Sequence, residues 1–155
     1  MNSYTNEEEN IIKKATEILK SKFSRVGATM EGTTFCKDYL ILKLSDSDVE
    51  NFHCLFLDTS HRVISFEKLS SGTINRATVY PREILKRAFE NNASAIILAH
   101  NHMASPIRAS DADIKLTKLL VENFKIFDVK ILDHIIVSEG DAMSFFDSGL
   151  LWLIN

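Results

Sequence analysis

The amino-acid sequence predicts an α/β (α+β) domain in which helices flank a mixed β-sheet. Helical and extended patterns alternate along most of the 155 residues, as expected for layered sheets and helices. Two neighbouring extended segments are separated by a short turn, which indicates an antiparallel hairpin. Two later segments, 93–99 and 129–137, are almost continuously apolar, which is typical of strands covered on both faces.

The first two elements are expected to be helices. Thr5 followed by Glu8 fits a capping box. Apolar residues then recur at helical spacing as far as Phe23, which indicates an amphipathic helix. Residues 35–44 indicate a second, shorter helix, and the Ser-Asp-Ser-Asp stretch 45–48 ends it.

The predicted hairpin comprises strands at 49–57 and 62–69 with a turn at 58–61, followed by a loop at 70–73. A third helix begins at Pro81, because proline suits the first helical position. The first of the two apolar strands, 93–99, comes next.

The second half of the chain continues the alternation. A loop over 101–109 leads to a helix that begins at Ser110 and carries apolar residues at helical spacing. The apolar strand 129–137 follows, and residues 142–145 are expected to form a short last strand. Since the hairpin is antiparallel, the complete sheet should be mixed.

Composition describes an ordinary globular protein, with 45% hydrophobic and 25% charged residues. The net charge of −3 argues against a protein that grips nucleic acid over its whole surface. Cys36 and Cys54 form no CxxC motif, so we expect small buried residues in a reducing compartment. The acidic N-terminus does not resemble a signal peptide, and no apolar run reaches membrane-spanning length. We therefore expect a cytoplasmic protein.

Two histidines, His100 and His102, stand where a buried strand ends. Alternate residues of an extended chain point to the same side, so both imidazoles can converge on one point. Asp113, in the first turn of the next helix, is a candidate carboxylate ligand. Each signal also has an ordinary structural explanation: His-x-His can be a polar loop entrance, and Ser110 with Asp113 fits a capping box.

Together these residues have a distinctive spacing: His-x-His, seven residues, Ser, two residues, Asp. The spacing resembles the motif of the JAMM (Jab/MPN) metalloprotease superfamily, which also requires a glutamate on an earlier strand, where Glu50 stands. More of the chain is similar to the RadC-like branch of that superfamily. The similar blocks are, in order, ENFHCLFLD, SGTINRATVYPREILKRAF, NASAIILAHNH, SDADIKLTKLL and KILDHIIV.

The resemblance implies a JAB/MPN-type sheet, mixed but largely antiparallel, with a cytidine-deaminase-like architecture. It implies a RadC-like JAB/MPN domain over 34–155, preceded by an N-terminal helical segment, 1–33. That segment is too short for the helix-hairpin-helix unit of full-length RadC proteins, so the compact form is expected. Family members usually have Pro-Ser-Gly where this chain has residues 103–105, and proline where it has Ala109. These differences concern the loop rather than the ligands.

The implied activity is zinc-dependent hydrolysis of peptide or isopeptide bonds in a protein substrate. Zn²⁺ would be held by His100, His102 and Asp113, and would activate a water by lowering its pKa toward about 7. Glu50 would act as general base. Ser110 would donate a hydrogen bond to the developing oxyanion, a role expected to compete with capping its helix.

Other functions stay open at this point. RadC relatives are labelled DNA-repair proteins, so a nucleic-acid-interacting protein is one alternative, although no aromatic residues cluster with Arg or Lys for stacking. A zinc nucleotide deaminase is less well supported, because its His-x-Glu and Pro-Cys-x-x-Cys pieces are missing. A non-catalytic MPN scaffold is the third. Asp133 and His134 are interpreted as a hydrogen-bonded core pair, and His53 is placed on the strand face opposite Glu50.

Overall fold

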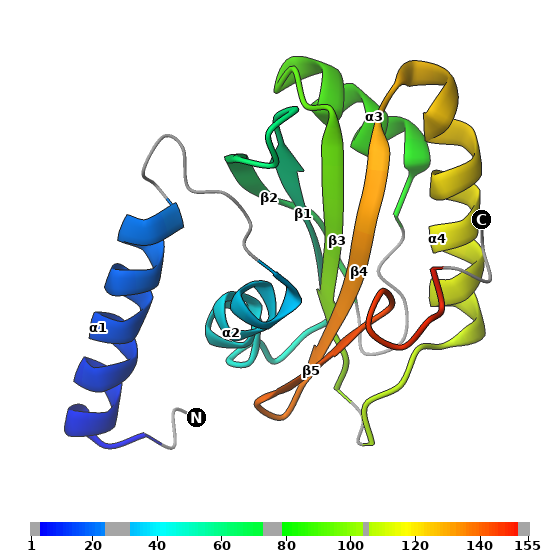
Figure 1. The fold of residues 1–155 in the computed structure, drawn as a ribbon. Coiled ribbons are helices and arrows are strands. Elements are labelled where there is room, and N and C mark those ends of the chain that lie inside the picture. The colour runs from blue at the N-terminus through cyan, green and yellow to red at the C-terminus, as the bar shows by residue number, and fades with distance from the viewer. Residues whose placement is uncertain (1–3, 24–31, 73–78, 104–105, 152–155) are drawn as a thin grey trace.

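A computed structural model describes residues 4–23, 32–72, 79–103 and 106–151 of the chain (Figure 1). It confirms the predicted fold class, an α+β domain built on a five-stranded mixed sheet. The elements in chain order are α1 (Asn6–Phe23), α2 (Thr33–Leu44), β1 (Asn51–Leu57), β2 (Val63–Ser71), α3 (Pro81–Glu90), β3 (Ala95–Asn101), α4 (Asp111–Phe124), the 3₁₀ turn η1 (Lys125–Phe127), β4 (Lys130–Ser138) and β5 (Asp141–Ser144).

The strands lie in the order β2-β1-β3-β4-β5. β1 is antiparallel to both β2 and β3, and β4 is antiparallel to β5, while β3 and β4 are parallel. The predicted hairpin and mixed sheet are therefore confirmed. Because β1 and β3 run in opposite directions, the beginning of β1 and the end of β3 lie at the same edge of the sheet, and Phe52 pairs with His100 there.

Every strand boundary differs by a residue or two from the sequence-based expectation except the end of β1; β3, for example, covers Ala95–Asn101 rather than 93–99. Ser70 and Ser71 belong to β2 rather than to a loop, because they pair with Phe52 and Asn51 across the hairpin. β1 begins at Asn51, so Glu50 stands one residue before the strand. Serine has no strong strand preference, and here backbone pairing with β1 decides the conformation.

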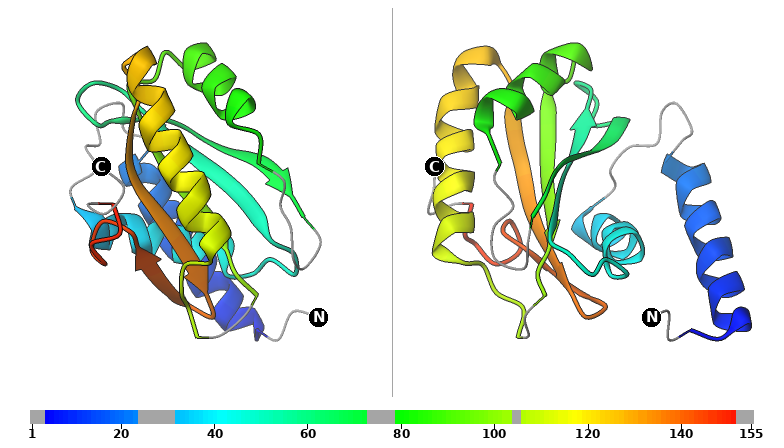
Figure 2. Two further views of the ribbon diagram at one scale, coloured as in Figure 1. Left: turned by 90° about the vertical axis from the view of Figure 1, so that its right-hand side faces the viewer. Right: turned by 180° about the vertical axis from the view of Figure 1, so that it is seen from behind.

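Helices cover both faces of the sheet, with α3 and α4 on one side and α2 on the other (Figure 2). Alternate residues of β3 point to opposite sides, so Ile96 packs in the cluster with α3 and α4, while Ile97 packs in the cluster with α2. All seven residues of β3 are buried. The apolar run was therefore correctly interpreted as a strand covered on both faces.

The first helix stands apart from the sheet (Figure 1). Its predicted capping box is present, because the Thr5 backbone N–H donates to Glu8 Oε2 at 2.7 Å. Its apolar side chains are only partly covered: Ile11 is 62% exposed and Ile18 is 50% exposed. The core of the domain is accordingly made by the later elements.

Both cysteines are buried, as expected, and neither forms a disulfide. Burial raises the pKa of Cys36 to about 12, with a smaller contribution from Asp133. Among the described residues, no helix is both long enough and apolar enough to span a bilayer.

Candidate metal centre

The end of β3 presents two imidazoles side by side. His100 is the next-to-last residue of β3 and is 5% exposed. His102 is the first residue after the strand. Their ring centroids are 4.6 Å apart. The backbone N–H of His102 donates to the Val137 carbonyl of β4 at 2.8 Å, so the chain stays extended as it leaves the sheet. The predicted convergence of the two rings is confirmed.

The helix α4 brings a carboxylate to the same point. Asp113 occupies the third position of α4, where the capping box with Ser110 orients the first turn. Its Oδ1 lies 3.2 Å from His100 Nε2, and its Oδ2 lies 3.2 Å from His102 Nε2. One ligand atom from each of the three residues lies within 4.8 Å of the others, so the group could hold one metal ion.

An unpartnered nitrogen supports this interpretation. His100 Nε2 is buried and has no hydrogen-bond partner, although Asp113 Oδ1 is near, because the two atoms do not meet in hydrogen-bond geometry. Buried polar atoms are nearly always satisfied. Two imidazole nitrogens and a carboxylate oxygen also form a common donor set for a divalent cation such as Zn²⁺. The residues present therefore fit a metal ion.

Contacts within the cluster shift the pKa values of Asp113 and His102. Burial opposes the charge on Asp113, yet contacts with His100 and His102 and the Ser110 hydroxyl hold its pKa far below the ordinary value. The hydrogen bond with Asp113 raises the pKa of His102 against the effect of burial, and the negative charge of Glu50 contributes to the same rise. The cluster thus holds an ionised carboxylate close to two imidazoles.

Glu50 lies across the sheet edge from the histidines. Phe52 pairs with His100, so the antiparallel register continued by two residues places Glu50 opposite His102. The side chain is half-buried, and the Glu50 carbonyl accepts a hydrogen bond from the Gly72 N–H at 2.9 Å. Its effect on the pKa of His102 agrees with a position beside the cluster. Glu50 is not one of the three residues that could hold the ion together.

Asn101, between the two histidines, holds the chain on both sides of Glu50. The Asn51 backbone N–H donates to Asn101 Oδ1 at 2.8 Å, and Asn101 Nδ2 donates to the Val49 carbonyl at 2.9 Å. Asn101 is 3% exposed. A single buried amide therefore joins the ligand-bearing strand to the segment that carries the glutamate, a role that sequence reasoning missed.

His134 was also missed as part of this site. Its Nε2 lies 2.8 Å from His100 Nδ1, and its Nδ1 lies 2.6 Å from the hydroxyl oxygen of Thr117 on α4. Complete burial, with a further contribution from His100, holds the pKa of His134 well below its usual value.

The interpretation of Asp133 and His134 as a core pair is only half right. Both are buried and hydrogen-bonded, but neighbouring strand residues point to opposite faces. Asp133 accepts hydrogen bonds from the Ser144 hydroxyl at 2.6 Å and from the Phe146 N–H at 3.0 Å. Its side chain therefore faces α2 and has no direct part in the histidine cluster.

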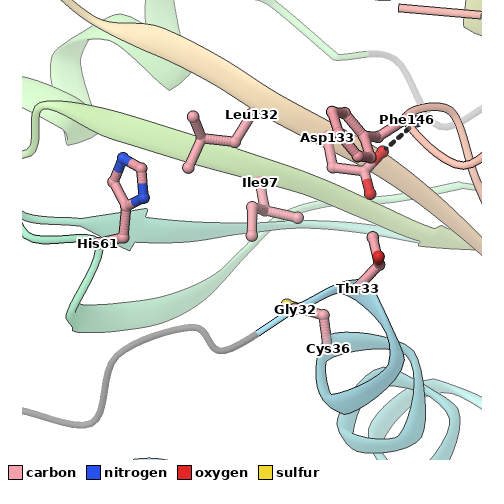
Figure 3. Close-up of a pocket in the computed structure, with 8 residues that line it drawn as sticks. All are labelled: Gly32, Thr33, Cys36, His61, Ile97, Leu132, Asp133 and Phe146. Atoms are coloured by element: carbon pink, nitrogen blue, oxygen red, sulfur yellow. Dashed lines mark hydrogen bonds between the residues drawn. The ribbon is translucent and has the colours of Figure 1, made fainter.

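A pocket of about 270 Å³ opens on that opposite face (Figure 3). The carboxylate of Asp133 lies in its wall with its hydrogen bonds already made, as Figure 3 shows for Phe146. His53 also belongs to that side of the sheet, where it stacks on Phe66 with ring centroids 4.8 Å apart, so the placement of His53 away from Glu50 agrees with the structure. The residues that line the pocket are Gly32, Thr33, Cys36, His61, Ile97, Leu132, Asp133 and Phe146.

Ser110 caps its helix. Its Oγ accepts from the Asp113 N–H at 3.1 Å and donates to Asp113 Oδ2 at 2.7 Å. The N–H uses a lone pair of the hydroxyl, whereas the hydroxyl proton serves Oδ2. Ser110 could therefore donate its proton to another acceptor and still cap the helix through its oxygen. Only its hydrogen bond to Asp113 Oδ2 would be lost, which is less than the sequence suggested.

Comparison with known proteins agrees with this geometry. A family model described as a RadC-like JAB domain matches residues 31–150. A UPF0758 protein of Pseudomonas fluorescens is 48% identical over 129 residues, which are 83% of this chain and 57% of that protein. A UPF0758 protein of Nitrosococcus oceani is 50% identical over 73% of this chain and 50% of its own length. A UPF0758 protein of Ralstonia nicotianae is 42% identical over 90% of this chain and 62% of its own length. The chain thus spans about half to three fifths of these curated relatives.

Proposed function

The chain belongs to the RadC-like JAB domain family, and from this premise we propose that it is a zinc-dependent hydrolase of peptide or isopeptide bonds. The observation that carries the proposal is that ligand atoms of His100, His102 and Asp113 lie within 4.8 Å of one another, and that one of them, the buried His100 Nε2, has no hydrogen-bond partner. Peptide or protein substrates follow from the reaction class. The UPF0758 names of the relatives specify no reaction.

His100, His102 and Asp113 would hold the ion. Two neutral imidazoles and one carboxylate leave a coordination position for a substrate or water, as in catalytic zinc sites. A bound Zn²⁺ supplies Lewis-acid polarisation of a carbonyl and lowers the pKa of water.

Glu50 would serve as the general base and acid. Its carboxylate takes a proton from the attacking water and delivers it to the leaving amine. The half-buried position beside His102 and the two backbone anchors supplied by Asn101 support this role, because proton transfer requires a held geometry. A residue just before β1, on a different segment of the chain from the three ligands, can face the reacting carbonyl without competing for the ion.

Ser110 would donate to the oxyanion of the tetrahedral intermediate. To do so the hydroxyl proton must turn away from Asp113 Oδ2, while the oxygen continues to accept from the Asp113 N–H. A carboxylate that binds a cation is a weaker hydrogen-bond acceptor, so binding of the cation favours rotation of the Ser110 hydroxyl away from Asp113. Loss of such a donor typically lowers kcat by about 10²–10³-fold.

A cavity of about 200 Å³ is lined by His102 but by none of His100, Asp113 and Glu50, and its apolar residues Leu44 and Val137 pack in the cluster with α2. Its polar lining residues include Ser47, Ser138 and Glu139. Such mixed lining suits a short side chain or a turn of peptide backbone.

The test combines metal analysis with hydrolysis. Protein purified without chelator should retain one divalent cation per chain, and should cleave members of a random peptide library, with products identified by mass spectrometry. Glu50→Gln should retain the metal and lose cleavage, whereas Glu122→Gln, at an exposed position on α4, should keep both. Protein without metal, or cleavage unaffected by Glu50→Gln, would overturn the proposal. A metal-loaded protein that cleaves nothing would favour a scaffold.

A further inference from the structure

Three consecutive hydrogen bonds connect two of the candidate ligands through the interior. His100 Nδ1 meets His134 Nε2 at 2.8 Å, and His134 Nδ1 meets Thr117 Oγ1 at 2.6 Å. Thr117 Oγ1 in turn lies 2.7 Å from the backbone carbonyl of Asp113, one helical turn earlier. The chain of bonds therefore begins at one ligand's ring and ends on another ligand's backbone.

The direction of these bonds can be worked out by counting protons. A carbonyl oxygen only accepts, so the Thr117 hydroxyl must donate its single proton to Asp113. The same oxygen then has only lone pairs left for His134. Consequently His134 Nδ1 carries a proton and donates it to Thr117.

His134 is enclosed completely, with 0% exposure. Its nitrogens contact an imidazole and a hydroxyl, not a carboxylate, and its ring lies against Phe52 and Phe145. A charged imidazole in that enclosed setting would have no carboxylate in contact, so the ring carries one proton, and that proton is on Nδ1. His134 Nε2 is then an acceptor, and His100 Nδ1 must be the donor.

A neutral His100 with its proton on Nδ1 has a lone pair on Nε2, the atom that faces Asp113 and makes no hydrogen bond. Only an unprotonated imidazole nitrogen can bind a metal ion. We propose that Thr117 and His134 are positioning residues that set the tautomer of His100, so that its Nε2 is ready for a divalent cation before the cation arrives. Because this series of hydrogen bonds ends on the Asp113 carbonyl, the distance between His100 and Asp113 also depends on how α4 packs on β4. This rests on the metal-binding part of the proposed function and is independent of hydrolysis.

The decisive comparison is Thr117→Val against Thr117→Ser. Valine has nearly the same shape but has no hydroxyl, so His134 Nδ1–H would lose its acceptor. The His134 proton then favours Nε2, where it donates to His100 Nδ1, and the His100 proton moves to Nε2. Serine keeps the hydroxyl and should keep the original arrangement. Mutations of groups that orient metal ligands typically weaken binding by about 10–100-fold, and we expect that loss for Thr117→Val.

Two measurements avoid any use of hydrolytic activity. Long-range proton–nitrogen NMR of the metal-free, nitrogen-15-labelled protein assigns the protonated nitrogen of each imidazole, and requires no variant to fold. Competition between the protein and a zinc chelator gives the affinity for Zn²⁺, with circular dichroism confirming that each variant is folded. The expected result is Nδ1–H on both His100 and His134 in the wild type, with weaker Zn²⁺ binding only in Thr117→Val.

A proton on Nε2 of His100 in the metal-free wild type would overturn the inference. Equal Zn²⁺ affinity in Thr117→Val and the wild type would do the same. Since neither measurement involves a substrate, a protein that hydrolyses nothing can still satisfy both, and an active hydrolase can still fail both.

Discussion

Replacing Asn101 with alanine tests how strongly one buried amide stabilises the junction between β1 and β3. The substitution removes the acceptor of the Asn51 N–H and the donor to the Val49 carbonyl, at 2.8 and 2.9 Å. The Val49 carbonyl keeps two other donors, Ser47 Oγ at 2.7 Å and Asn51 Nδ2 at 3.2 Å, whereas the Asn51 N–H loses its acceptor in a residue that is only 8% exposed. One buried unsatisfied group costs about 1–3 kcal/mol of unfolding free energy.

The assay is equilibrium unfolding in urea, with the free energy obtained by linear extrapolation. Asn123→Ala is the matched control, because Asn123 is exposed on α4 and donates only to the Leu119 carbonyl of its own helix. The control should change stability by no more than about 0.5 kcal/mol in either direction. A loss of less than about 1 kcal/mol in Asn101→Ala would refute the reasoning, since it falls below the cost of the one orphaned N–H.

The same substitution should affect chemistry more than stability alone explains. Val49 and Asn51 flank Glu50, and both lose an anchor when the amide is removed. A displacement of about 1 Å in a catalytic group can cost about 100-fold in rate. If hydrolysis is established, kcat should fall while Zn²⁺ affinity stays near the wild-type value, because His100 and His102 keep their own partners.

Two further predictions concern His53 and Ser110. Burial, followed by the charge of Lys68, lowers the pKa of His53 to about 4 from 6.5, so the unfolded chain binds the proton more readily, and stability is lost as pH falls from about 6.5 toward 4. Between pH 7 and pH 5 the wild type should lose about 1–2 kcal/mol more than His53→Phe in urea unfolding; equal losses would contradict this. Ser110→Ala should cost about 1 kcal/mol through the lost cap, and Ser110→Gly only a few tenths. If the hydroxyl stabilises the oxyanion, both variants should lose hydrolysis equally, whereas activity that follows stability would indicate capping alone.

The local patterns in the sequence were sufficient for the elements and for three candidate ligands. Continuous apolar character identified β3, because a strand covered on both faces has no polar side. The His-x-His spacing identified His100 and His102 as candidate ligands, because an extended strand end places alternate side chains together. Asp113 was proposed from its place in the first turn of the next helix and from the resemblance to the JAMM motif. Residues 104 and 105, which form part of the altered loop, lie outside the residues that the structure describes.

Other features depend on contacts between distant parts of the chain. No local pattern marks Asn101, whose two backbone partners lie near residue 50, and no pattern shows that His134 faces His100 rather than Asp133. These contacts arise from the antiparallel register of β1 with β3 and the parallel register of β3 with β4. The sequence by itself determined which groups stand at the strand ends, because periodicity and burial are local properties. Only the tertiary structure decided which of them share a hydrogen bond, because that depends on partners brought together by the sheet.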